Sequence, residues 1–289
     1  MKQITVISGK GGTGKTTLTA ALTSIMDKVV VADCDVDAPD LHLLLKPQVI
    51  EKEEFTGSKV ASINKEKCMS CGLCKDNCRF MAISDDFVVD EHACEGCGVC
   101  TLVCPVHAID FREKLSGYTY ISKIENGFMS HALLKPGEEN SGKLVTKVRE
   151  NAKEIAYREN VDLVLIDGSP GIGCPVISSI TGVDAVLVVT EPTISGIHDL
   201  KRIIELTKHF HIKPFVCINK FDINESKTQE IEDFCKKEGI EVVSKIPFDK
   251  IVVEAMINGE TVIKYAPNSE ISKAVVKIWE ELSKALGII

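Results

Sequence analysis

The stretch SGKGGTGKTT (residues 8–17) follows directly on the apolar run QITVI and decides the fold. From Gly9 to Thr16 it satisfies the spacing G-x-x-x-x-G-K-[ST], in which a glycine-rich loop joins a strand to a helix and cradles phosphate groups. Lys15 is the lysine that reaches the outer phosphates, and the Thr16 hydroxyl is a ligand for Mg²⁺. We expect the nucleotide to be bound by Gly9, Gly11, Gly12, Thr13, Gly14, Lys15, Thr16 and Thr17.

Runs rich in Val and Ile recur along the chain and are apolar almost throughout, as in strands buried on both faces. They predict strands at 3–8, 28–33, 161–167, 184–190, 213–219 and 240–246. Patterns of helical period separate most of them, at 15–26, 143–159, 196–209, 225–238 and 270–286. This alternation predicts an α/β fold with a doubly wound, mainly parallel sheet.

The composition narrows the classes of protein and partner. The 289 residues are 44% hydrophobic and 26% charged, which is ordinary for a globular protein, and the net charge of −8 argues against a nucleic-acid partner. Since no apolar run reaches the roughly 18 residues of a membrane span, we expect no membrane partner. The N-terminus passes straight into the first strand and the phosphate-binding loop, so we expect a cytoplasmic protein without a signal peptide.

Twelve cysteines, eight of them between Cys68 and Cys104, are too many for chance, and the cluster interrupts the alternation after the second strand. Nothing indicates a secreted, disulfide-bonded protein, so metal binding is the better interpretation. The spacing C-x2-C-x2-C-x3-C occurs twice, as CMSCGLCKDNC (68–78) and CEGCGVCTLVC (94–104). Zinc is the alternative, but it normally uses ligand pairs separated by a longer spacer, and two complete runs favour iron–sulfur clusters.

The two runs resemble those of bacterial ferredoxins with two [4Fe–4S] clusters, in which the fourth cysteine of each run ligates the other cluster. The resemblance implies one cluster held by Cys68, Cys71, Cys74 and Cys104. It implies a second cluster held by Cys94, Cys97, Cys100 and Cys78. Pro105 matches the proline of that family, whereas Arg79 stands at the corresponding place of the first run. The acidic surplus over 65–110 suits either steering towards a basic redox partner or merely a soluble surface.

Carboxylates follow two of the predicted strands. Asp167 ends the run LVLID, the position of an aspartate that acts on Mg²⁺ in P-loop proteins. Asp33 and Asp35 lie at the end of the second strand, where a carboxylate can assist the metal or orient the attacking water. We expect Thr16, Asp33 and Asp167 at the Mg²⁺ ion and a catalytic role for Asp35.

The strand at 213–219 ends in Asn219-Lys220-x-Asp222, which resembles the N-K-x-D of GTPases, where the aspartate selects guanine. Asn219 by itself pairs equally well with adenine, so these residues predict a purine nucleotide and leave the base open. The stretch IPFDKIVVEAMINGE (246–260) follows closely enough to close over the base.

Four cysteines lie outside the duplicated motif. Cys34, Cys217 and Cys235 fall in strand or helix patterns and are expected in the core. Cys174 follows the stretch GSPGIG. No second ligand cysteine is obvious, so we expect a buried structural thiol, and a metal role is the alternative.

Together these residues resemble the MinD/ParA/Mrp superfamily of P-loop ATPases. KGGTGKT (10–16) matches its deviant Walker A motif, ADCDVDAPDL (32–41) its second-strand region and DGSPG (167–171) its Walker B motif. The resemblance implies ATP over GTP, with Mg²⁺. It also implies a nucleotide-dependent homodimer, or a heterodimer with a paralogue, in which Lys10 reaches the partner's phosphates; the alternative is that Lys10 merely lengthens a basic loop. The expected catalytic residues are Lys10, Lys15 and Asp35.

The branch that the chain resembles carries an inserted ferredoxin domain. We expect a P-loop ATPase domain in 1–57 and 113–289, with a connecting strand and loop at 113–142, and an inserted α+β ferredoxin-like domain in 58–112. The leading hypothesis is ATP hydrolysis coupled to electron transfer through two [4Fe–4S] clusters to a redox or metallocentre protein. The alternatives are an iron–sulfur or metallocentre assembly factor and a redox-sensing regulatory switch.

Overall fold

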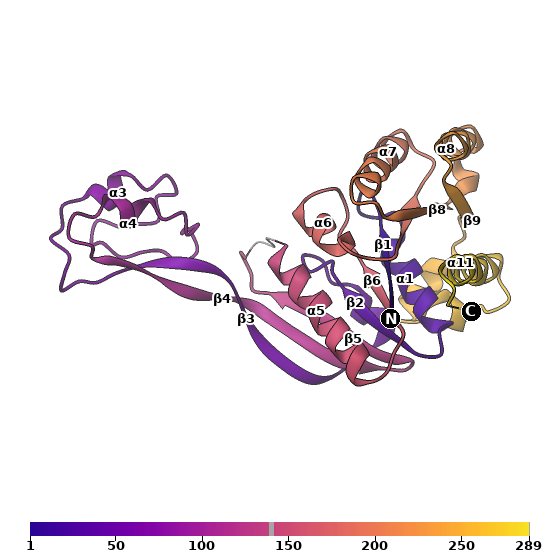
Figure 1. Ribbon diagram of the computed structural model, residues 1–289, viewed down its shortest axis with the longest axis horizontal. Coiled ribbons are helices and arrows are strands. Elements are labelled where there is room, and N and C mark those ends of the chain that lie inside the picture. The colour runs from indigo at the N-terminus through magenta and orange to yellow at the C-terminus, as the bar shows by residue number, and fades with distance from the viewer. Residues whose placement is uncertain (139–141, 289) are drawn as a thin grey trace. The chain divides into compact units, whose positions relative to one another are not determined.

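The computed structural model describes residues 1–138 and 142–288. The chain forms two compact units (Figure 1). The first comprises Met1–Glu53, Thr119–Leu133 and Asn140–Ile289, and the second comprises Glu54–Tyr118 and Leu134–Glu139. Residues 139–141, in the loop expected within 113–142, lie outside the described residues.

The first unit is built on a parallel sheet whose central strands have the order β2-β6-β1-β7-β8-β9. These strands are β1 (Lys2–Ile7), β2 (Val29–Asp33), β6 (Leu163–Asp167), β7 (Ala185–Thr190), β8 (Lys213–Asn219) and β9 (Glu241–Ile246). The six strands predicted from apolar runs are thereby confirmed within two residues. The strand order reverses direction next to β1, and in such sheets ligands bind at the carboxyl edge beside this point.

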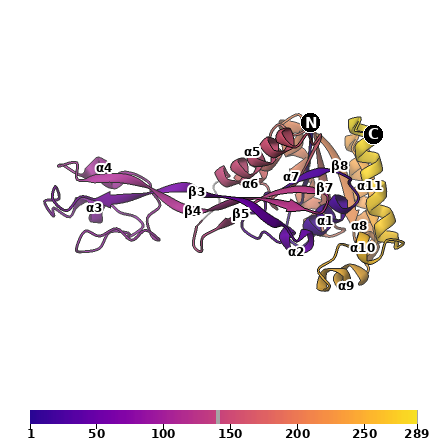
Figure 2. The ribbon, with the colours of Figure 1, turned by 90° about the horizontal axis from the view of Figure 1, so that it is seen from below.

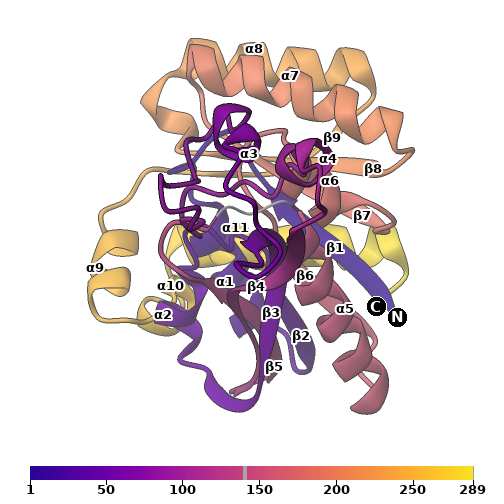
Figure 3. The same cartoon turned by 90° about the vertical axis from the view of Figure 1, so that its left-hand side faces the viewer.

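Helices cover both faces of this sheet, so the predicted doubly wound arrangement is confirmed (Figure 3). One face carries α1 (Lys15–Ser24), α10 (Val262–Tyr265) and α11 (Glu270–Leu286). The other carries α5 (Lys143–Arg158), α6 (Cys174–Ile180), α7 (Ile194–His209) and α8 (Glu225–Glu238). Figure 2 shows α11 beside the short helices α9 (Ile251–Ile257) and α10. Helix α2 (Leu41–Leu45) lies against α1.

Local sequence explains why several helices begin and end where they do. Thr193, Asn224 and Ser269 precede α7, α8 and α11, and each side chain accepts a hydrogen bond from a backbone N–H of the first turn. Gly239 and Gly287 follow α8 and α11 with positive φ angles of 70° and 64°, as helix-ending glycines do. These helices match the sequence prediction closely.

Three strands extend the sheet beyond β2 in the order β3-β4-β5-β2. They are β3 (Gln48–Ile63), β4 (Ile109–Ile124) and β5 (Gly127–Leu134). Strand β5 runs parallel to β2, with Gly127 opposite Val29. The sequence predicted one connecting strand and a loop here, because β3 and much of β4 carry charged, exposed side chains and lack the apolar runs of buried strands.

The second unit contains two short helices, α3 (Leu73–Asp76) and α4 (Val99–Val103), and the ends of β3 and β4. Its small core comprises Ala61, Cys74, Ile83 and Ile109, with four partly buried cysteines and two phenylalanine rings packed against them. Its boundaries enclose the 58–112 segment expected to form a ferredoxin-like domain. Among residues 1–138 and 142–288, no helix is long and apolar enough to cross a membrane.

Candidate functional site

The phosphate-binding loop connects β1 to α1, as its motif predicts. Gly12 and Gly14 have φ angles of 78° and 90°, which side-chain-bearing residues rarely adopt. A Cβ atom on Gly14 would also lie 2.5 Å from Nδ2 of Asn219. Both glycines are therefore required by the path of the loop, which delivers Lys15 to the first position of α1.

Lys15 lies at the centre of a buried ionic cluster. Its Nζ atom is 2.9 Å from Oδ1 of Asp167, 3.4 Å from Oδ2 of Asp35 and 3.1 Å from Oγ1 of Thr16. Burial lowers the pKa of Lys15, but the carboxylates of Asp167 and Asp35 outweigh it and raise the pKa overall. Lys15 therefore stays charged although its side chain is buried.

Carboxylates outnumber cations in this cluster. Asp33 and Asp167 stand opposite each other on adjacent parallel strands, and burial, together with the charge of Asp167, raises the pKa of Asp33 well above its usual range. Burial likewise raises the pKa of Asp35. Oδ2 of Asp33 and Oδ2 of Asp167 are buried and find no hydrogen-bond partner among the described residues. An excess of buried carboxylate oxygen is the donor set that a hard cation such as Mg²⁺ prefers.

A cavity of about 560 Å³ opens beside this cluster. It is lined by seven of the expected phosphate-binding residues, Gly11, Gly12, Thr13, Gly14, Lys15, Thr16 and Thr17. Asp35, Ser169 and Met256 complete other parts of the wall. Gly9 is not part of the lining: a Cβ atom there would lie 2.1 Å from Cβ of Asp199, so this glycine allows the loop to pack on α7.

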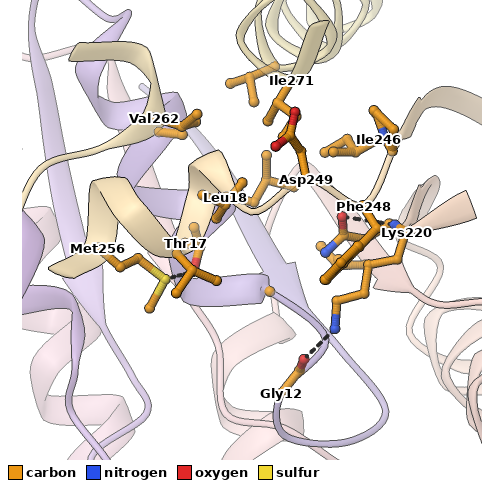
Figure 4. A pocket seen from close by; sticks show the side chains of 18 residues that line it. Gly12, Thr17, Leu18, Lys220, Ile246, Phe248, Asp249, Met256, Val262 and Ile271 are labelled. Atoms are coloured by element: carbon orange, nitrogen blue, oxygen red, sulfur yellow. Dashed lines mark hydrogen bonds between the residues drawn. The ribbon is translucent and has the colours of Figure 1, made fainter. Parts of the chain in front are cut away.

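A second, more apolar cavity of about 330 Å³ adjoins the first (Figure 4). Its lining includes Leu18, Ile246, Phe248 and Met256, from the helix after the loop and from the 246–260 stretch expected to close over the base. Asn219 also lines it. This cavity matches in chemistry the flat, largely apolar faces of a purine.

The Asn219-Lys220-x-Asp222 motif is occupied by contacts to the backbone. Asn219 donates from Nδ2 to the Thr13 carbonyl over 2.7 Å, and Asp222 Oδ1 accepts from the Phe248 N–H over 2.7 Å. Figure 4 shows Lys220 pointing at the loop, where its Nζ lies 3.3 Å from the Gly12 carbonyl oxygen. The motif thus braces the loop and the 246–249 turn, a role that the sequence analysis missed.

Lys10 does not point into the large cavity. Its Nζ atom lies 2.6 Å from Oε1 of Glu191, at the carboxyl end of β7, and 3.2 Å from Oγ of Ser195 in the first turn of α7. The sequence analysis did not single out Glu191. The acidic residue directly after an apolar strand, the same signal that identified Asp167, could have found it.

The duplicated cysteine motif of the second unit is a duplicated backbone as well. Three left-handed φ angles of the first copy recur 26 residues later: they occur at Ser70 and Gly96, at Gly72 and Gly98, and at Met81 and His107. Gly72 and Gly98 directly precede α3 and α4, which start inside the two cysteine runs. The two cysteine runs therefore share these backbone turns and helix starts.

The ends of the two copies are paired crosswise by backbone hydrogen bonds. The N–H of Asn64, before the first run, bonds to the carbonyl of Ala108, after the second. In the same way the N–H of Asp90, before the second run, bonds to the carbonyl of Ala82, after the first, and both distances are 2.8 Å. The tail of each run therefore lies beside the head of the other.

The last cysteine of the first run lies with the first three cysteines of the second run. One hollow is lined by four cysteines, Cys78, Cys94, Cys97 and Cys100. Burial raises the pKa of Cys74, with Cys68 and Cys71 close enough to add to the effect. The Ala108 N–H points at Sγ of Cys104 over 3.3 Å. No three metal-binding side chains among the described residues meet closely enough to hold a single ion.

The remaining cysteines differ from expectation at one position. Cys34, Cys217 and Cys235 are buried in the first unit, as predicted. Cys174 is exposed, so the prediction of a buried thiol is wrong. It is the first residue of α6, after a glycine-rich loop, and not part of an apolar run that enters the core.

Comparison with known proteins gives one family match and several relatives that span most of the chain. Residues 4–262 match the model of the CobQ/CobB/MinD/ParA nucleotide binding domain. An uncharacterized protein of Methanocaldococcus jannaschii is 33% identical over 98% of this chain and 96% of its own length. An iron-sulfur cluster carrier protein of Pyrococcus abyssi is 24% identical over 98% of this chain and 86% of its own length.

The fold is also similar to that of a solved protein, the cell division ATPase MinD of Pyrococcus furiosus. The TM-score is 0.61 and the identity 21%, with 98% of this chain and 99% of the other covered. With a family match that spans most of the chain and a P-loop at the carboxyl edge of a parallel sheet, the chain belongs to the CobQ/CobB/MinD/ParA family of nucleotide-binding domains.

Proposed function

We propose that the first unit binds and hydrolyses ATP. The supporting observation is the buried cluster at the loop, in which one lysine faces three carboxylates and two carboxylate oxygens lack partners among the described residues. Thr16, Asp33 and Asp167 would hold Mg²⁺, which supplies charge neutralisation at the phosphates. Lys15 binds the outer phosphates, and Asp35 orients the attacking water.

The proposal includes the identity of the base. One oxygen of Asp222 accepts the Phe248 N–H, and the Asn219 amide bonds to Thr13. The carboxylate that selects guanine in N-K-x-D proteins is thus already used to hold the 246–249 turn. This arrangement supports adenine over guanine.

Lys10 is proposed to bind the nucleotide phosphates of a second subunit in a dimer. The loop brings it to the surface, where its side chain is 36% exposed. A second copy of the chain, or a paralogue, that docks over the nucleotide would receive Lys10 at its phosphates, where a cation stabilises charge that develops during transfer.

We infer that the second unit is a ferredoxin-like domain with two [4Fe–4S] clusters. The exchanged hydrogen bonds of Asn64 and Asp90 support the crossed ligand sets. The sets are Cys68, Cys71, Cys74 and Cys104 for one cluster and Cys94, Cys97, Cys100 and Cys78 for the other. Cysteines around a cube each bind a different iron, so their sulfur atoms lie further apart than ligands of a single ion. Backbone N–H groups aimed at sulfur, as at Cys104, are typical of such sites.

The function that combines both units is electron transfer controlled by ATP. Each cysteine set is complete within one chain, which suits clusters that stay bound and pass electrons to a redox or metallocentre partner. The second candidate is delivery of a cluster to another protein, which the Pyrococcus cluster carriers favour by name. A redox-controlled switch is the third.

The test is an anaerobic redox titration with EPR, with and without Mg-ATP, after iron and zinc have been counted. Typical coupling of about 1–3 kcal/mol corresponds to a shift of roughly 45–130 mV for one electron. A shift of that size supports the electron-transfer function. An unmoved potential, together with cluster transfer to an apo-ferredoxin, supports the carrier. Zinc in place of iron would overturn the ferredoxin assignment.

A further inference from the structure

Glu191 lies between the two lysines that contact the phosphate-binding loop. Oε1 of Glu191 is 2.6 Å from Nζ of Lys10, and Oε2 is 3.4 Å from Nζ of Lys220. Lys10 belongs to the loop itself, and Lys220 reaches the carbonyl of Gly12. One carboxylate at the end of β7 therefore binds one side of the loop directly and the other side through Lys220.

The main chain around Glu191 is held in a tight turn. The carbonyl of Glu191 accepts the Thr193 N–H over 2.7 Å, and Thr193 caps α7 by accepting the Gly196 N–H. A Cβ atom on Gly196 would lie 2.3 Å from the Glu191 carbonyl oxygen, so only glycine allows this tight turn. Ser195, held in the same turn, gives Lys10 its second partner. Glu191 and Ser195 thus form a preformed acceptor for the Lys10 ammonium group.

The charge balance at this point favours an ionised carboxylate. Burial raises the pKa of Glu191, but the hydrogen bond and charge of Lys10, with the charge of Lys220, outweigh burial and lower the pKa overall. The Glu191 side chain is 13% exposed and that of Lys10 is 36% exposed. An ion pair open to water on one side holds its lysine weakly enough to be exchanged for another anion.

We propose that Glu191 is a positioning residue that keeps Lys10 against its own subunit until a second copy of the chain offers nucleotide phosphates. Glu191 and Ser195 hold the Lys10 ammonium group against α7 of its own subunit, so Lys10 has to leave Glu191 in order to reach the phosphates of a second copy. The Lys10–Glu191 pair therefore opposes dimerisation. This inference rests on the proposed action of Lys10 across a dimer.

The first experiment replaces Glu191 by Gln, which keeps the shape and removes the charge. Sedimentation with Mg²⁺ and a non-hydrolysable ATP analogue measures the dimer Kd. Loss of one partly exposed ion pair is worth about a two- to fivefold change. A homodimer breaks one such pair in each subunit, so E191Q should dimerise about four- to twenty-five-fold more tightly. The matched control E205Q, at an exposed glutamate of α7, makes the same change in net charge and should leave the dimer Kd unchanged.

A double-mutant cycle separates this role from a merely structural one. In the K10A background E191Q should no longer tighten the dimer, whereas in the K220A background it should still do so. Weaker or unchanged dimerisation of E191Q, or an effect that disappears only in K220A, would overturn the proposal while leaving the dimer itself intact. If the unaltered chain does not dimerise with the analogue, or if K10A dimerises as well as it does, the action of Lys10 across a dimer is wrong and the inference with it.

Discussion

Nζ of Lys15 lies 2.9 Å from Oδ1 of Asp167, and both side chains are almost fully buried. The lysine is the first residue of α1, directly after the loop that follows β1, and the aspartate ends β6, the strand that pairs with β1. Thr19, one turn into α1, donates to the same Asp167 oxygen over 3.0 Å. The phosphate-binding lysine is thus part of the fold as well as of the site.

Removal of this lysine should cost stability. Lys15→Met leaves three neighbouring carboxylates without a cation, and breaking a buried ion pair typically costs about 3–5 kcal/mol. We expect the free energy of unfolding in urea at pH 7, without nucleotide, to fall by that order. Lys10→Met removes a partly exposed pair and should cost about 1 kcal/mol or less. Equal losses in the two variants would contradict the burial argument.

Two loop glycines should differ in how much their replacement by alanine lowers the free energy of unfolding. At Gly9 a Cβ atom would lie 2.1 Å from Cβ of Asp199, whereas at Gly11 no atom lies within 4 Å. Gly9→Ala should lower the free energy of unfolding by about 1–3 kcal/mol, the usual cost of overpacking. Gly11→Ala should leave it nearly unchanged, and thermal unfolding of the two nucleotide-free variants compares them. A stable Gly9→Ala variant would show that the loop does not need this close approach to α7.

The crossed cysteine sets predict which double variants lose both clusters. Cys78→Ala and Cys94→Ala each remove a ligand of the same cluster, so the double variant should keep about four iron atoms, as each single variant does. Cys78→Ala with Cys68→Ala should remove nearly all iron. Iron counting on anaerobically purified protein decides between the patterns. The reverse outcome would mean that each run holds its own cluster.

His131 should make the stability of the first unit depend on pH. Its ring stacks on Tyr120 at 5.1 Å, and its Nε2 lies 2.8 Å from Oγ of Ser122. Burial, with a smaller contribution from the charge of His42, lowers the pKa of His131 to about 4. Between pH 6.5 and 4 the unfolded chain therefore binds a proton that the folded chain does not, so stability should fall as the pH falls through that window.

The free energy of unfolding should be about 1–2 kcal/mol lower at pH 5 than at pH 7. Urea unfolding at the two pH values measures this difference. His131→Phe keeps a stacked ring without a titrating nitrogen and should reduce the difference. His92→Phe, at an exposed position, should leave it as it is. A difference that His131→Phe does not alter would assign the pH dependence to other groups.

Much of the first unit could be predicted from the sequence because its signals are local. Continuous runs of Val and Ile predict the six buried strands. Helices α8 and α11 follow capping residues and are followed by glycines. The phosphate-binding motif around Lys15 and the two cysteine runs are likewise short continuous stretches of sequence, so they can be recognised without the structure. Strands β3 and β4 were not predicted in full, because exposed strands paired in a ribbon carry no continuous apolar run.

The sequence by itself therefore determined the sheet, its helices, the phosphate-binding loop and the duplicated cysteine motif. Only the tertiary structure decided which side chains meet across the carboxyl edge of that sheet. Glu191 is 181 residues from Lys10, and Asp222 is 26 residues from the Phe248 N–H that it binds. Such pairs have no spacing rule, because the distance between them is set by the packing of strands that are neighbours in the sheet and distant in the chain.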